Sequence, residues 1–133
     1  MNGAQWHLLI NHLPVFGLIF GLLVELASRI RKSEELQRAA LALFVVTALG
    51  TIPAYMTGDP AEHVVQGMPE VSRDQIDSHS DWGTASLVAI EALGAATLAG
   101  LFLGRKSGAI SALAVNGCLA LAIVGFFLVA WTS

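Results

Sequence analysis

The hydrophobic positions of the chain fall into four long runs that are separated by more polar segments. These runs cover residues 8–27, 39–56, 84–103 and 109–131. A helix needs roughly 20 apolar residues to cross a hydrocarbon core about 30 Å thick, and each run is close to that length. The pattern therefore predicts four membrane-spanning helices in a single domain over residues 1–133. The predicted fold class is all-α, an integral membrane four-helix up-down bundle.

The basic residues predict the orientation of this bundle. Six of the seven Lys and Arg residues lie between spans one and two or between spans three and four: Arg29, Arg31, Lys32, Arg38, Arg105 and Lys106. Connections rich in Lys and Arg stay on the cytoplasmic side, so both termini and a structured loop over 57–81 are predicted outside, in the periplasm if the membrane is a bacterial inner membrane. The aromatic residues suited to headgroup level all lie at the predicted outer ends of spans: Trp6, Tyr55, Trp82 and Trp131.

The composition narrows the function classes. Hydrophobic residues make up 55% of the chain and charged residues 13%, which indicates a lipid bilayer as the surroundings. The net charge of −3 gives no reason to expect a nucleic-acid partner. No nucleophile stands in a recognisable motif with a base, so hydrolytic catalysis has no support. The N-terminus lacks Lys, Arg and a small-residue cleavage site, so we expect the first helix to be retained.

Local motifs predict where the helices bend and begin. The first helix is expected over residues 5–31 with a kink near Pro14, because proline removes a backbone hydrogen bond. In the outer loop, residues 59–62 (Asp-Pro-Ala-Glu) match a capping box with Asp59 at the N-cap, which predicts a short helix. A second capping box at residues 72–75 places the start of the third helix well outside the membrane.

Small residues predict close helix packing. Gly17 and Gly21 are four residues apart on the first span, so a neighbouring helix is able to approach them closely. That neighbour is either a second copy of the chain or another helix of the same bundle, and we favour packing within the bundle.

The four histidines are the strongest chemical signal, because all of them fall at the predicted outer end of the bundle: His7, His12, His63 and His79. Imidazole is a common metal ligand and an axial ligand of haem, and helical bundles hold cofactors between facing helices. His7 and His12 are five residues apart, about 140° around a regular helix, so they do not both face one small ion. The alternative is that interfacial histidines are simply solvated.

A carboxyl group near the middle of the third span is the second chemical signal. At that depth Glu91 must be protonated, paired or in contact with water. One interpretation is a proton relay or a quinone contact that includes Glu91 and Asn116. The interpretation that we favour is structural, a neutral Glu91 hydrogen-bonded to Asn116 or to a threonine such as Thr47 or Thr51.

Three short motifs carry a resemblance that covers nearly the whole chain. They are His7-x-x-x-Asn11-His12-Leu13-Pro14, the loop Thr57-Gly58-Asp59-Pro60-Ala61-Glu62, and His79 near the head of the third span. The chain thereby resembles a family of small four-helix bacterial inner-membrane proteins of largely unassigned function, whose relatives include fusions to c-type cytochrome domains. The resemblance implies that His7, Asn11, His12 and His79 form the site, and it does not require His63.

The chain departs from that family pattern at two places. Ser80 follows His79 where the pattern has Glu, and Asp81 comes next. A Gly-Gly and Arg-His tail common in relatives is absent after Ser133. We therefore expect an outer-face ligand or partner contact of the family to be missing here.

We predict that the bundle binds a b-type haem near its outer surface and transfers electrons between the quinone pool and an external acceptor, or within a larger respiratory complex. The preferred axial ligands are His12 and His79, followed by His7, and a His7 and His79 pair is geometrically as good. Asn11 is expected to hydrogen-bond a ligand or a propionate, and the turn at 59–62 to cover the site. His63 is a further candidate contact. The expected partners are other membrane subunits or a cytochrome c-type protein outside.

Two other functions stay open. In the first, the chain is a non-redox accessory subunit whose histidines are structural or bind a transition metal such as Zn²⁺ or Cu, and whose glycine faces dock to a larger assembly. In the second, it binds quinone or relays protons around Glu91.

Overall fold

The computed structural model describes residues 2–132, and over this range the chain forms helices joined by short connections. Their order is α1 (Gly3–Ile10), α2 (His12–Arg31), α3 (Glu34–Met56), α4 (Gly58–Val65), α5 (Arg73–Ser107) and α6 (Ala112–Thr132). Four rods are long and apolar enough to cross a membrane: α1 with α2, α3 with α4, α5, and α6. The all-α class with four such rods confirms the prediction, although α6 begins at Ala112 rather than at residue 109.

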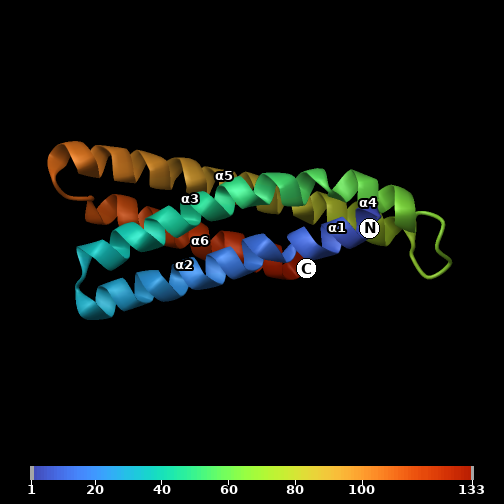
Figure 1. Ribbon diagram of the computed structural model, residues 1–133, viewed down its shortest axis with the longest axis horizontal. Helices are drawn as coiled ribbons and strands as arrows, with labels where there is room; N and C mark the ends of the chain where they lie inside the picture. The colour runs from blue at the N-terminus through green and yellow to red at the C-terminus, as the bar shows by residue number, and fades with distance from the viewer. Residues whose placement is uncertain (1, 133) are drawn as a thin grey trace.

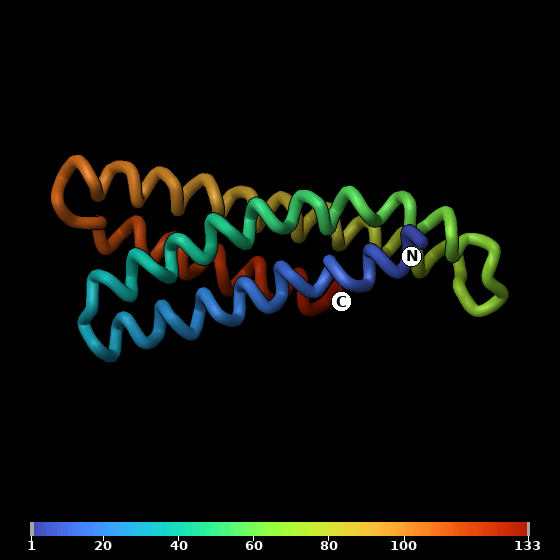
Figure 2. The backbone as a smooth tube through the Cα atoms, viewed as in Figure 1, coloured from blue at the N-terminus to red at the C-terminus, as the bar shows by residue number. Residues whose placement is uncertain are grey.

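The four rods form a ring of antiparallel neighbours (Figure 1). α2 packs against α3 and α6, and α5 packs against the same two helices from the other side. The α2–α3 and α5–α6 connections lie together at one end of the bundle, which we call the hairpin end (Figure 2). The opposite end carries α1, α4, the loop before α5 and the last turn of α6, and we call it the terminal end.

The interior of the ring is filled by large apolar side chains that meet small ones. Leu18, Phe44 and Ile90 are fully buried. A Cβ added at Gly17 would collide with the Thr47 side chain on α3. A Cβ added at Gly21 would collide with the Phe44 side chain, which is also on α3. The glycine pair on α2 therefore serves packing within the bundle, which is the interpretation that the sequence favoured.

The first rod is two helices, and the break between them positions the site. α1 ends at Ile10 and α2 begins at His12, with Asn11 between them. Pro14 explains the break, because it has no N–H to donate to the carbonyl of residue 10 and its ring crowds that carbonyl. The N-terminus of α1 is fixed by a capping box in which Asn2 and Gln5 exchange two hydrogen bonds of 3.0 Å.

The outer loop follows its predicted motifs only in part. The second capping box is present, since Ser72 Oγ accepts from Gln75 N and Gln75 Oε1 accepts from Ser72 N. The first one was wrongly predicted: α4 already begins at Gly58 and has no side-chain cap, so Asp59 lies in its first turn. The reason is that α4 continues from α3 through Thr57, whose carbonyl accepts from Ala61 N and so starts the helix earlier.

Candidate functional site

A cavity of about 590 Å³ lies at the terminal end, within the range of roughly 300–1,000 Å³ that is typical of small-molecule sites. α1 and α4, which pack against each other, form one side of it, and α5 forms the other. Its polar lining includes His7, Asn11, Tyr55, Glu62, Gln75 and His79. The cavity reaches down to Pro14, Thr51 and Ser86, so it extends from the loop into the head of the bundle.

Two histidines face each other across this cavity. The ring centroids of His7 on α1 and His79 on α5 are 5.9 Å apart, and the ring planes are inclined at 80°. A metal–nitrogen bond of about 2.0 Å places two imidazole centroids about 6 Å apart when they bind opposite sides of one metal ion. The observed separation is therefore compatible with two ligands on one metal.

Thr57 fixes the tautomer of His7. Thr57 Oγ1 donates its single proton to Ala54 O at 2.8 Å, and it lies 3.1 Å from His7 Nδ1. The hydroxyl therefore accepts at His7, which makes Nδ1 the N–H donor and leaves the lone pair on Nε2. A histidine held at one nitrogen in this way is typical of metal ligation through the other. The sequence motif contains Thr57, but its spacing gives no sign of this orienting role.

Asn11 supplies a polar atom without a partner. It stands at the break between α1 and α2 and lines the cavity. Its Oδ1 is buried and has no hydrogen-bond partner among the residues that the structure describes. Leaving such an oxygen unsatisfied costs about 1–3 kcal/mol, so the arrangement fits a bound ligand that brings a donor.

The other two histidines lie apart from this pair. His12 is exposed, and its Nδ1 lies 3.1 Å from Leu8 O on the preceding turn. His63 on α4 is also exposed, and neither residue lines the cavity. Of the site residues that the sequence indicated, the structure thus brings His7, Asn11 and His79 together, and it separates His12 and His63 from them.

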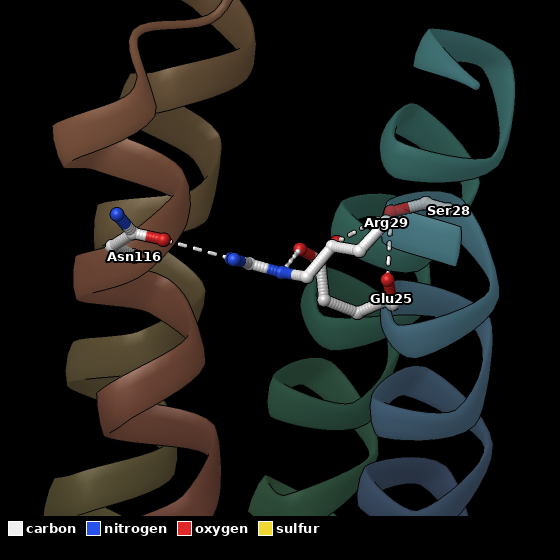
Figure 3. Close-up of polar contacts among 4 residues, drawn as sticks. All are labelled: Glu25, Ser28, Arg29 and Asn116. Atoms are coloured by element: carbon white, nitrogen blue, oxygen red, sulfur yellow. Dashed lines mark hydrogen bonds and ion pairs between the residues drawn. The ribbon is translucent and has the colours of Figure 1, made fainter. Parts of the chain in front are cut away.

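Asn116 belongs to a different polar group, near the hairpin end (Figure 3). Arg29 Nη2 of α2 donates to Asn116 Oδ1 of α6 at 2.8 Å, and Arg29 Nε donates to Glu25 Oε1 at 2.9 Å. Glu25 is 1% exposed and also lies near the Ser28 hydroxyl. We had not singled out this network, although the four-residue spacing of Glu25 and Arg29 is a signal for such a pair.

The side chain of Glu91 makes no hydrogen bond among the described residues, so the bond predicted to Asn116, Thr47 or Thr51 was wrong. Its Oε1 is buried without a partner among the described residues, and it does not line the cavity. Asn116 is out of reach of Glu91. Thr97 on α5 lies against Cys118 on α6, so Asn116 is level with a part of α5 about two turns beyond Glu91 toward the hairpin end. The hydroxyls of Thr47 and Thr51 each donate to a carbonyl of their own helix, and among the described residues neither is joined to Glu91 by a hydrogen bond.

No protein-family model, curated protein or solved structure matches this chain. The family resemblance drawn from the sequence motifs therefore stays a prediction.

Proposed function

We propose that this protein is a membrane-embedded electron-transfer subunit that binds a b-type haem at the terminal end through His7 and His79. The observation that supports this function is the facing pair of imidazoles, one of which has its tautomer fixed by Thr57. The proposal keeps the cofactor predicted from the sequence and replaces His12 by His7 in the ligand pair.

The number of ligands favours haem over a lone metal ion. Among residues 2–132, no group of three or more His, Cys, Asp or Glu side chains is arranged to hold a metal ion. Zinc sites in proteins use three or four protein ligands. Haem needs only axial ligands from the protein, because the porphyrin supplies the other four, so two histidines are sufficient.

The pair lies at the surface of the terminal end, since His7 is half-buried and His79 is exposed. Haem would supply one-electron Fe(III)/Fe(II) chemistry, and the protein tunes that chemistry through ligation, burial and hydrogen bonds. Thr57 orients His7, and Asn11 offers an amide to a ligand or a propionate. α1 and α4 pack against each other, and residues of both line the cavity.

We infer that the terminal end faces the periplasm of a bacterium, because the hairpin end carries nearly all the basic residues. The terminal end is rich in carboxylates, which lie on α4, in the loop before α5 and at the start of α5: Asp59, Glu62, Glu70, Asp74, Asp77 and Asp81. Such a surface attracts basic partners, so a c-type cytochrome is the proposed acceptor and the quinone pool the proposed donor. Other membrane subunits would complete the complex.

An absorption spectrum tests the haem centre. Protein purified from haem-replete cells should show a sharp α-band on reduction with dithionite. His7→Ala and His79→Ala should each lose it, whereas His12→Ala and His63→Ala, at exposed positions on neighbouring helices, should keep it. A haem-free wild-type preparation, or loss of the band in His12→Ala alone, would overturn the proposal. Elemental analysis would then test for Zn or Cu.

A further inference from the structure

A second, smaller cavity adjoins the first and shares His79 with it. Its volume is about 320 Å³. Asp74, Ser78, His79 and Trp82 line it from α5, and Trp131 and Thr132 line it from α6. The seam between the two helices closes just below, where Ser86 Oγ and Thr132 Oγ1 lie 3.2 Å apart. A ligand here would therefore touch a residue of the proposed redox centre without entering the first cavity.

Two indole rings form one wall of this cavity. The ring centroids of Trp82 and Trp131 are 6.4 Å apart at an angle of 62°, and both side chains are exposed. Trp residues near the ends of spans lie at headgroup level, which lipid-borne molecules reach from the bilayer. Phe127 is exposed one turn before Trp131 on α6, and it continues this apolar surface toward the hairpin end. The wall therefore suits a planar ring with an apolar tail.

Of the polar residues that line the cavity, Gln75 bonds to Ser72 and Thr132 to Ser86 and to Leu128 O, whereas three others are left for a ligand. Asp74, Ser78 and Trp82 succeed one another at four-residue intervals, so they share one face of α5. Within residues 2–132, the side chains of Asp74, Ser78 and His79 make no hydrogen bond to the protein. A carboxylate, a hydroxyl and an imidazole are thus available to a ligand that offers both donors and acceptors.

We propose that this second cavity binds the ring of a lipid-soluble quinol. The flat ring packs against Trp82 and Trp131, and one ring hydroxyl donates to the Asp74 carboxylate. The second ring oxygen accepts from Ser78 or from the N–H of His79. A quinol matches these features together, because it is planar, carries an oxygen at each end of the ring and has an apolar tail that stays in the bilayer while the ring lies outside the hydrocarbon.

The redox role of this cavity rests on the proposed haem function, whereas ring binding does not. Oxidation of a quinol here would remove two electrons, one at a time, and a haem held by His7 and His79 would take up the second after the external acceptor has removed the first. The quinol releases two protons, for which Asp74 is the first acceptor, and it leaves as the quinone. The distance for electron transfer would be short, because His79 lines both cavities.

Tryptophan fluorescence tests the binding directly in the full-length protein. The Trp6→Phe variant leaves emission only from Trp82 and Trp131, and decylubiquinone serves as the quenching probe. We expect quenching that saturates, with a half-saturation concentration raised about tenfold by Asp74→Asn, which weakens a charge-assisted hydrogen bond. The control is Asp77→Asn, which removes the same charge about one turn further along α5. Asp77 does not line the cavity, so this variant should leave the titration unchanged. Quenching that rises linearly, or that saturates equally in all variants, would overturn the proposed site.

Reduction of haem by decylubiquinol separates this inference from the proposed function. With haem bound, quinol should generate the α-band, and Asp74→Asn should slow its appearance about tenfold. A haem-loaded protein that quinol fails to reduce and that shows no saturable quenching would refute the quinol site while the haem function stands. Saturable, Asp74-dependent quenching in a haem-free protein would support the quinol site and refute the haem function.

Discussion

The ring of His7 on α1 lies 5.9 Å from the ring of His79 on α5, although the two residues are more than half the chain apart. The contact joins the N-terminal helix to the third rod across the cavity at the terminal end. Asn11, between α1 and α2, has helical backbone angles of −62° and −23° and donates its N–H to His7 O, so α1 continues the first rod toward the cavity. The two imidazoles therefore meet because the first rod reaches past the head of the bundle to the level of His79.

The Thr57 hydroxyl should control how firmly the cofactor is held. Thr57→Val keeps the shape of the side chain but removes the acceptor that fixes His7 Nδ1–H. Partners of this kind change ligand affinity by about 10–100-fold, so we expect haem retention to fall by roughly that factor. The measurement is a haem titration of haem-depleted protein. Thr57→Ser restores the acceptor and should recover affinity, and equal affinity for the Val and Ser variants would contradict an orienting role.

The sequence was sufficient for features that depend on nearby residues. The rods follow from apolar runs, and the start of α5 at Arg73 follows from the capping box of Ser72 and Gln75. The break near Pro14 follows from the chemistry of proline. Each of these depends on residues within one or two helical turns, so the sequence pattern already contains the cause.

The site itself depends on how distant helices meet, and there the sequence was less informative. Judged by depth along the bundle alone, His12 with His79 was as acceptable a ligand pair as His7 with His79. The sequence does not give the rotation of α1 about its axis, which decides between them. The partner of Asn116 was mistaken for the same reason. Its level on α6 is set by packing such as that of Cys118 against Thr97, and this level matches Arg29 rather than Glu91.

Close approach of α5 and α3 should make Gly94 intolerant of a side chain. A Cβ at Gly94 would lie 2.5 Å from Ala48 Cβ, whereas a Cβ at Gly117 on α6 meets nothing within 4 Å. Gly94→Ala is therefore expected to lower the free energy of unfolding by about 1–3 kcal/mol through overpacking. Unfolding in SDS, followed by circular dichroism, measures the change. Gly117→Ala is the control and should be neutral or slightly stabilising, so equal destabilisation by both would argue against close packing at this seam.

The buried carboxylate at the hairpin end should depend on Arg29. Arg29→Leu leaves Glu25 buried without its cation, and loss of one partner of a buried pair costs roughly 3 kcal/mol. Asn116→Ala removes only one hydrogen bond and should cost about 1 kcal/mol. The same unfolding assay measures both variants. Adding Glu25→Gln to Arg29→Leu should recover much of the loss, because the uncompensated charge is then gone. A double variant as unstable as Arg29→Leu would mean that packing of the arginine stem, rather than charge, is what matters.

Asn11 should favour ligand binding at the expense of stability. Its Oδ1 is buried without a partner among the described residues, so in ligand-free protein Asn11→Leu removes an unsatisfied oxygen and should be neutral or stabilising by up to about 1 kcal/mol. In the same variant haem affinity should fall about tenfold, because the amide no longer contacts the ligand. The measurements are unfolding of haem-depleted protein and a haem titration, each compared with wild type. A residue that serves only the fold would lose stability on this change, whereas a residue kept for a ligand loses affinity instead. Destabilisation of the haem-depleted protein with unchanged haem affinity would therefore assign Asn11 to the structure of the α1–α2 break and remove it from the site.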